Sequence, residues 1–244
     1  MQSTRDKVWY LLILLLTVDL LFIILHILAV NHLVSGRFSI ERDGGIPEFF
    51  QYSKEAWLAL VLASVAMLKQ QRVYWAWSGF FAFLLLDDSL RLHETGGQVL
   101  QHALHFNAMF NLRAQDFGEL AVYGVTGLLF SIWIVIAHFN SDSSARTNSV
   151  RVGLLVVALF FCGVIVDMLH SMAVVAGISW SRAFALLEDG GEMIIASVIC
   201  MVVFRFALAS GLKGALALDW LLQPLLRRTT RPLAEPEEGT QPAG

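Results

Sequence analysis

Charged residues are scarce in this chain. Asp, Glu, Lys and Arg make up 15% of its 244 residues, whereas they make up roughly a quarter of an average soluble protein. Hydrophobic residues make up 57%, and the mean hydropathy is +0.64. This composition excludes a disordered chain, a collagen-like repeat and a coiled coil, and it indicates an integral membrane protein surrounded by the lipid bilayer. The net charge of -3 gives no reason to expect nucleic acid as a partner.

Proline and cysteine are also few. All five prolines lie outside the long apolar runs, so the helices in those runs should be unbroken: Pro47, Pro224, Pro232, Pro236 and Pro242. The two cysteines, Cys162 and Cys200, lie within such runs and are expected to be small packing residues rather than a disulfide. The sequence has no Walker loop, dinucleotide-binding glycine motif, Gly-x-Ser-x-Gly elbow or Cys-x-x-Cys pair, which excludes the enzymes that depend on them.

Six apolar segments are candidates for helices that cross a bilayer, a distance that takes about 20 residues. They are predicted at residues 8–30, 54–68, 73–93, 117–138, 152–176 and 182–209. The expected fold is therefore all-α: a polytopic membrane helix bundle of six spans within residues 1–212. The aromatic residues 49–52 are expected at the interface before the second span. Residues 213–244 are expected to form a cytoplasmic tail, first amphipathic and then disordered.

The distribution of positive charge predicts the orientation, because cytoplasmic connections hold an excess of Lys and Arg. An arrangement with the N-terminus inside places eleven of the seventeen Lys and Arg residues in the cytoplasm and six, including Lys54, on the outer side. Most acidic residues then face outward, and Asp19 alone lies in the middle of a span. Both termini are therefore predicted to be cytoplasmic. The first span, with its internal Asp19, is expected to be retained rather than cleaved as a signal peptide.

Ionisable residues from several spans are predicted at one depth. At a rise of 1.5 Å per residue, Asp88 lies roughly 23 Å along the third span, and Asp167 lies roughly 22 Å along the fifth. The same outer third contains further acids and histidines: His26 of the first span, Asp87, His93 and Glu94 of the third, His170 of the fifth, and Glu188, Asp189 and Glu192 of the sixth. Such groups are costly in the hydrocarbon layer unless they are paired, hydrated or bound to a cation, so they are candidates for function.

The spacing of these residues is typical of ligands presented by a helix bundle. Asp167 and His170 are three residues apart and Glu188 and Glu192 are four apart, so each pair lies on one helix face. The predicted metal ligands are Asp88, His93, Asp167, His170, Glu188 and Glu192. Carboxylates with imidazoles suit zinc, manganese or iron better than copper(I). Glu94, as general base, and Asp87 are the predicted catalytic residues.

Simpler explanations exist for single members of this set. Asp87 and Arg91 could form an ordinary ion pair on a helix surface. Glu188 or Asp189 could compensate the positive end of the sixth helix. His26 and His170, taken alone, are more typical of hydrogen-bonded core histidines. These explanations do not account for the presence of seven such groups together at one depth: Asp88, His93, Glu94, Asp167, His170, Glu188 and Glu192.

The outer connection between the third and fourth spans has its own pattern. Residues 95–116 contain apolar residues with His102 and His105, which indicates an interfacial helix lying over the cluster as a lid. These two histidines could add ligands, although histidines at an interface are usually solvated. Glycine pairs adjoin the acids at residues 96–97 and 190–191, and they favour close helix approach or tight turns.

Three short segments carry a resemblance: residues 38–47 (FSIERDGGIP), 85–94 (LLDDSLRLHE) and 187–193 (LEDGGEM). They resemble the signature of uncharacterised bacterial multi-pass membrane proteins, in which an acidic pair precedes His-Glu and a second acidic group lies in the last helix. The resemblance implies a location in the bacterial inner membrane and brings no known activity. In this chain the last-helix group begins with Glu188-Asp189, where that pattern has Glu-Glu.

The function most consistent with these features is that of a metal-dependent, membrane-embedded enzyme, a hydrolase or oxidoreductase acting on a lipid or another amphiphile. A bound metal would lower the pKa of a water molecule and polarise a carbonyl or phosphoryl group. Two alternatives stay open. The acids could serve a proton- or cation-coupled transporter, or the polar cluster could hold together a non-catalytic subunit of a membrane complex.

Overall fold

The structure, a computed structural model, describes residues 2–177 and 181–211, and the predicted tail at 213–244 lies outside them. The described chain is all-α, as predicted. Its first half contains α1 (Gln2–Val30), the short 3-10 turn η1 (Gly36–Phe38), α2 (Ile46–Lys69), α3 (Arg72–Leu90), α4 (Leu92–Leu104) and α5 (Ala114–Phe139). Next, α6 (Ser143–Phe160), the π-helical η2 (Phe161–Val166) and α7 (Asp167–Val175) follow one another without a break. The last helix is α8 (Ser181–Ala209).

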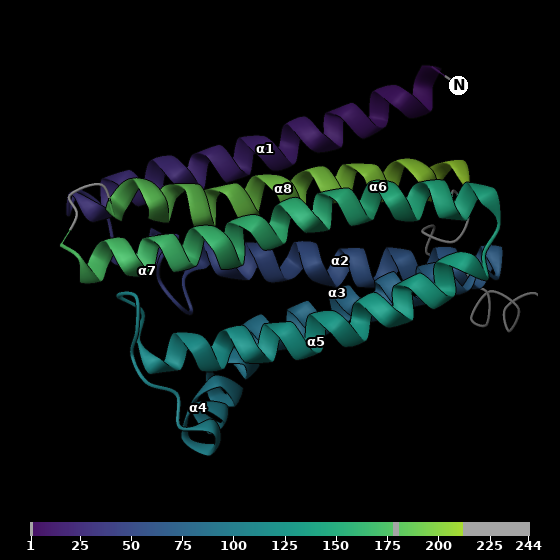
Figure 1. The fold of residues 1–244 in the computed structure, drawn as a ribbon. Helices are drawn as coiled ribbons and strands as arrows, with labels where there is room; N and C mark the ends of the chain where they lie inside the picture. Colours follow the sequence, from purple (N-terminus) through teal and green to yellow (C-terminus); the bar gives the residue numbers. More distant parts are fainter. Residues whose placement is uncertain (1, 178–180, 212–244) are drawn as a thin grey trace, which may run out of the picture.

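The long helices lie side by side, and α4 projects obliquely from the bundle beside α5 (Figure 1). α8 packs against α1, α2 and α6, while α3 packs against α2 and α5. The core between them is made of fully buried aliphatic and aromatic residues, including Leu58, Leu62, Phe81, Ile199 and Val203. Burial of this apolar surface holds the helices at the spacing that the polar residues need.

In the part of the chain that the structure describes, four helices are long and apolar enough to cross a membrane: Lys7–Val30, Ala114–Phe139, Ser143–Val175 and Ala183–Ala209. Their outer surfaces carry large exposed apolar side chains, such as Leu129 and Leu154, which suits contact with lipid tails. Helices α2 and α3 have 24 and 19 residues but are more polar, because α2 contains Lys54 and Glu55 and α3 contains Asp87 and Asp88. Four of the six predicted spans therefore coincide with helices that are long and apolar enough to cross a membrane.

Two predicted boundaries are wrong. Helix α2 begins at Ile46, so residues 49–52 belong to it and do not form a separate segment before it. The third predicted span ran to residue 93, but α3 ends at Leu90, and Arg91 adopts the left-handed conformation (φ 54°). His93 and Glu94 therefore lie in the first turn of α4. The new helix can start there because the Asp87 carboxylate accepts a hydrogen bond from the His93 backbone N–H at 2.8 Å.

The two short turns α2–α3 and α5–α6 meet at one end of the bundle. The backbone N–H of Asp142 donates to Oε1 of Gln71 at 2.9 Å. The backbone N–H of Val73 donates to the Ser141 hydroxyl at 3.3 Å. These bonds join the α2–α3 pair to the α5–α6 pair at the end of the bundle opposite Asp88 and Glu188.

The sequence analysis counted Lys54 among the residues on the outer side; in the structure it lies inside the bundle. Helix α2 extends eight residues beyond it, so its side chain is fully buried and pairs with the buried Asp19 carboxylate at 3.0 Å. The ammonium also donates to the Met193 carbonyl, and the Ser197 hydroxyl donates to Asp19. This buried ion pair joins α1, α2 and α8.

Candidate functional site

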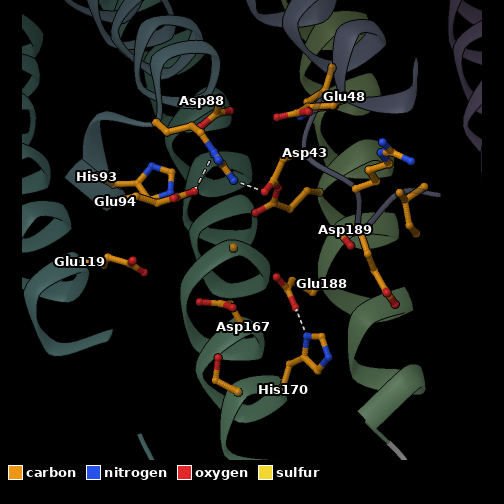
Figure 2. A pocket seen from close by; sticks show the side chains of 18 of the residues that line it. Asp43, Glu48, Asp88, His93, Glu94, Glu119, Asp167, His170, Glu188 and Asp189 are labelled. Carbon is orange, nitrogen blue, oxygen red and sulfur yellow. Dashed lines mark hydrogen bonds and ion pairs between the residues drawn. The ribbon is translucent and has the colours of Figure 1, made fainter. Parts of the chain in front are cut away.

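A cavity of about 550 Å³ opens at one end of the bundle. Its wall comes from the α1–α2 connection and from α2, α3, α4, α5, η2, α7 and α8, and Figure 2 shows the side chains turned into it. Ten acidic residues line this wall: Glu41, Asp43, Glu48, Asp88, Glu94, Glu119, Asp167, Glu188, Asp189 and Glu192. Only three arginines do so, namely Arg42, Arg91 and Arg113. We call this cavity the acidic pocket.

The structure brings the predicted site residues together in this pocket. Asp88, His93, Glu94, Asp167, His170, Glu188 and Glu192 all line it. Asp87 lies behind the wall and is 1% exposed. Other candidates lie elsewhere: the buried His26 contacts Ser39, and His102 and His105 are exposed near the far end of α4.

Asp87 fixes the orientation of His93. One carboxylate oxygen accepts the His93 backbone N–H, and the other lies 3.2 Å from His93 Nδ1. The imidazole also stacks on Tyr123, with ring centroids 5.1 Å apart. Burial opposes the charged form of His93, but the hydrogen bond to Asp87 and the nearby acids outweigh it and raise the pKa of His93. Since Nδ1 faces Asp87, Nε2 is the ring atom left for another partner.

Arg91 does not pair with Asp87, contrary to the simpler explanation. Its guanidinium contacts Asp43 and, at 3.0 Å, Glu94 (Figure 2). Asp87 is therefore not half of a surface ion pair.

Within residues 2–177 and 181–211, Asp87, Asp88 and His93 form a group that could hold a metal ion. Each can offer one ligand atom, and these atoms lie within 4.8 Å of one another. Carboxylate oxygens with an imidazole nitrogen are a ligand set that zinc, manganese and iron accept.

A second polar group lies across the pocket. His170 Nδ1 is 2.8 Å from Glu188 Oε2, so α7 and α8 are joined by this contact (Figure 2). Asp167 and Asp189 line the same part of the wall. The two groups are linked through Glu192, whose carboxylate lies within electrostatic range of Asp88, Asp167, Glu188 and Asp189.

The π-helical segment makes room for Glu192. A methyl group on Gly163 would overlap Glu192 Oε1, so only glycine leaves space for this carboxylate. One residue earlier, Cys162 packs so closely on α8 that a methyl group on Gly191 would lie 2.9 Å from its sulfur. π-Helical turns inside α-helices occur frequently at functional sites. The sequence did not indicate Gly163 as part of the site.

Helix α4 is present where an interfacial helix was predicted, but it does not cover the pocket. Only its first turn, with His93 and Glu94, reaches the wall. The rest packs against α5 at a very close approach, since a methyl group on Gly118 would overlap the Gly97 carbonyl. The glycines at 96–97 thus serve close helix packing, one of the two roles expected of them.

Helix α2 contributes residues that the sequence analysis missed. Glu48, Gln51, Tyr52 and Glu55 share one face of α2 and lie along the two cavities of this region. Among the described residues, Glu55 Oε2 and Gln51 Oε1 are buried and have no hydrogen-bond partner. The spacing of three, four and seven residues was a usable signal, but the first three of these positions lie before the predicted start of the second span at residue 54, and only Glu55 lies within it.

The fold and the pocket define a class of protein: an all-α chain with several candidate membrane helices that surround a strongly acidic pocket at one end. Over residues 8–206 the chain matches the model of the family described as "Domain of unknown function (DUF8692)", and it belongs to this family. Comparisons with curated proteins and with solved structures give no significant match.

Proposed function

We propose that the chain crosses a bacterial inner membrane six times, with both termini in the cytoplasm and the acidic pocket on the outer side. Helices α2 and α3 lie alongside the four apolar helices (Figure 1). Their connecting turn is bonded to the α5–α6 turn, which supports placing both turns on one side of the membrane. The excess of Lys and Arg at that end supports a cytoplasmic assignment.

Within this topology, the protein is a metal-dependent enzyme. The observation that carries this proposal is the Asp87, Asp88 and His93 group, with ligand atoms within 4.8 Å, at a pocket that gathers all the other predicted ligands. Asp88 and His93, through Nε2, would hold the metal, and Asp87 would keep the imidazole in the required orientation. Glu192, and beyond it Asp167, His170 and Glu188, complete the set of ligands. A divalent metal here would activate water and polarise a substrate carbonyl or phosphoryl oxygen.

Glu94 is the proposed general base. It lines the pocket one residue after His93, and its carboxylate is positioned by Arg91 at 3.0 Å. Asp87 is better described as a positioning residue than as a catalytic one, because both of its oxygens face His93. The substrate is a lipid or another amphiphile that reaches the pocket from the membrane.

Metal content of the detergent-purified protein tests this proposal. We expect stoichiometric zinc, manganese or iron in the wild type and at least tenfold less in Asp88→Asn and His93→Gln. The matched control is His102→Gln, which changes a histidine of the same helix that is exposed and does not line the pocket. Metal retained in both site variants, or a wild type free of metal after growth with each metal, would contradict the proposal.

A proton- or cation-coupled transporter is the second candidate, and one observation favours it. The Asp19–Lys54 pair is fully buried, and Lys54 adjoins Glu55, which faces the cavities. Charged groups placed in this way are common in ion and proton pathways. A metal-free protein that produces pH-dependent ion flux in liposomes would favour transport. A metal-free protein without flux, recovered together with another membrane protein, would favour the role of a non-catalytic subunit.

A further inference from the structure

A second, smaller cavity adjoins the acidic pocket. It has a volume of about 120 Å³ and is lined mainly by apolar side chains of α3, α5, α6 and η2: Phe80, Phe83, Leu84, Phe130, Val156, Leu159, Phe160 and Val164, with Thr126 and Gly127. Five residues line both cavities, namely Gln51, Asp88, Tyr123, Gly163 and Glu192. We call the smaller cavity the apolar slot. Because the walls are shared, the two cavities form one site with a polar and an apolar half.

The apolar slot faces the part of the molecule that lipid tails would surround. It lies between α5 and α6, which pack against each other much less than α5 packs against α3 and α4. The neighbouring outer surfaces carry exposed apolar side chains, including Val125, Leu129 and Val157. A hydrocarbon chain can therefore enter the slot sideways from the membrane without crossing polar groups.

In the described part of the chain, two buried oxygen atoms lack a hydrogen-bond donor where the acidic pocket and the apolar slot meet. The Glu55 side chain is 4% exposed and lines the slot, and its nearest polar neighbour is the Asp88 carboxyl group. Both groups are acceptors when ionised, so Glu55 Oε2 has no hydrogen-bond donor among the described residues. The same holds for Oε1 of Gln51, one helical turn away. Buried oxygens without partners are unfavourable, so these two acceptors point to a ligand that donates hydrogen bonds at this place.

The charge of the pocket restricts the polar end of that ligand. Ten acidic residues face three arginines on the wall. A divalent cation offsets only part of this excess, so an anionic headgroup such as a carboxylate is disfavoured. An ammonium group both carries the complementary charge and supplies the hydrogen-bond donors that Gln51 and Glu55 lack.

We propose that the site binds a single-chain amphiphile with an amino headgroup. The ammonium lies beside Gln51 and Glu55, next to the proposed metal ligands Asp88 and Glu192, and the first part of the hydrocarbon chain lies in the apolar slot. This inference names the substrate class of the proposed enzyme. It rests on the proposed function only for the reaction that the bound amphiphile undergoes. Recognition itself depends only on the two cavities.

The test uses the full chain in nanodiscs of zwitterionic lipid and two photoreactive probes. One is a hexadecylamine and the other a hexadecanoic acid, each with a diazirine in the middle of the chain. We expect the amine to label peptides of α3, α5 and α6 that line the slot, and the acid to label them at least fivefold less. Mass spectrometry of the digested protein locates and quantifies the labels.

Two glycines of α5 provide a matched pair of variants. A methyl group on Gly127 or on Gly124 would meet no atom within 4 Å, so neither position resists a larger side chain, but only Gly127 lines the slot. Gly127→Leu should reduce amine labelling of the slot at least fivefold, whereas Gly124→Leu should leave it unchanged. Equal labelling in both variants, or equal labelling by amine and acid, would overturn the inference.

Metal content of the same samples separates this inference from the proposed function. Gly127→Leu should keep the wild-type metal content, because Gly127 is not among the ligands. Selective amine labelling of a metal-free protein would support the binding site and reject the metal-dependent enzyme. Metal present without selective labelling would reject the amine and leave the metal proposal standing.

Discussion

At the scale of single residues, the most consequential contact outside the pocket lining is the ion pair between Asp19 and Lys54. Both side chains are fully buried, and Ser197 and the Met193 carbonyl complete their hydrogen bonds. A buried pair of this kind adds little net stability compared with apolar residues of the same volume, but loss of one partner leaves an uncompensated charge.

Lys54→Met should therefore lower the free energy of unfolding by about 3–5 kcal/mol. The double variant Lys54→Met with Asp19→Leu should recover most of that loss, because no charge then stays buried alone. Thermal unfolding in detergent, followed by intrinsic fluorescence, measures both effects. A single variant as stable as the wild type would show that Asp19 is hydrated or protonated.

Asp87 offers a test of positioning as distinct from metal ligation. In Asp87→Asn the amide can donate to His93 Nδ1, which places the ring proton on Nε2 and removes the metal-binding lone pair. We expect metal affinity to fall about 10–100-fold, the range typical of residues that orient a ligand. Chelator competition measures it, and His93→Gln should show the larger loss. Unchanged affinity in Asp87→Asn would remove Asp87 from the site.

At the scale of elements, the helix formed by α6, η2 and α7 shapes the centre of the pocket. Its π-helical segment brings Gly163 against Glu192 and Cys162 against Gly191. The sequence predicted one regular span at 152–176. Nothing in residues 161–166 (FCGVIV) breaks an α-helical pattern, so the change in hydrogen bonding depends on the packing of α8.

Gly163→Ala should lower stability by about 1–3 kcal/mol through overpacking and should displace the Glu192 carboxylate. The expected consequence is reduced metal content in a protein that still folds. Gly153→Ala, in α6, is the matched control, because its methyl group would make an ordinary contact with Trp77 at 3.6 Å. Equal stability and metal content in the two variants would mean that Glu192 is free to move aside.

Counting residues along helices was sufficient to predict that Asp88, Asp167 and Glu188 lie in one pocket, because the rise per residue is constant. It failed at Arg91, where a non-glycine residue takes the left-handed conformation and α4 begins. It also could not indicate that Lys54 lies inside the bundle, because its partners Asp19 and Ser197 are 35 and 143 residues away in the sequence. Contacts across such separations have no periodic signal.

At the scale of the whole molecule, the proposed topology depends on α2 and α3. If both cross the membrane, Lys69 lies in the cytoplasm. If neither does, the turn after α2 lies on the outer side of the membrane, separated from the α5–α6 turn to which it is bonded in the structure.

Single cysteines distinguish these arrangements. In a background with Cys162→Ala and Cys200→Ala, both buried sites, we expect an impermeant maleimide to label Leu33→Cys in intact spheroplasts. Lys69→Cys, also at an exposed position, should react only after the membrane is permeabilised. Reaction of Lys69→Cys in intact spheroplasts would reject the six-span topology.

Helix α5 packs closely against α3 and α4 but makes few contacts with α6, so the wall between α5 and α6 is the one that can open. Its C-terminal end is tied to α3 and α6 through Gln71, Ser141 and Asp142, while its N-terminal end carries α4 and touches α6 little. Swinging α5 outward about the Asn140 turn would widen both cavities and leave the core around Leu58, Phe81 and Ile199 intact. A ligand from the lipid would then enter by displacement of α5, which would pivot at the end of the bundle opposite the acidic pocket.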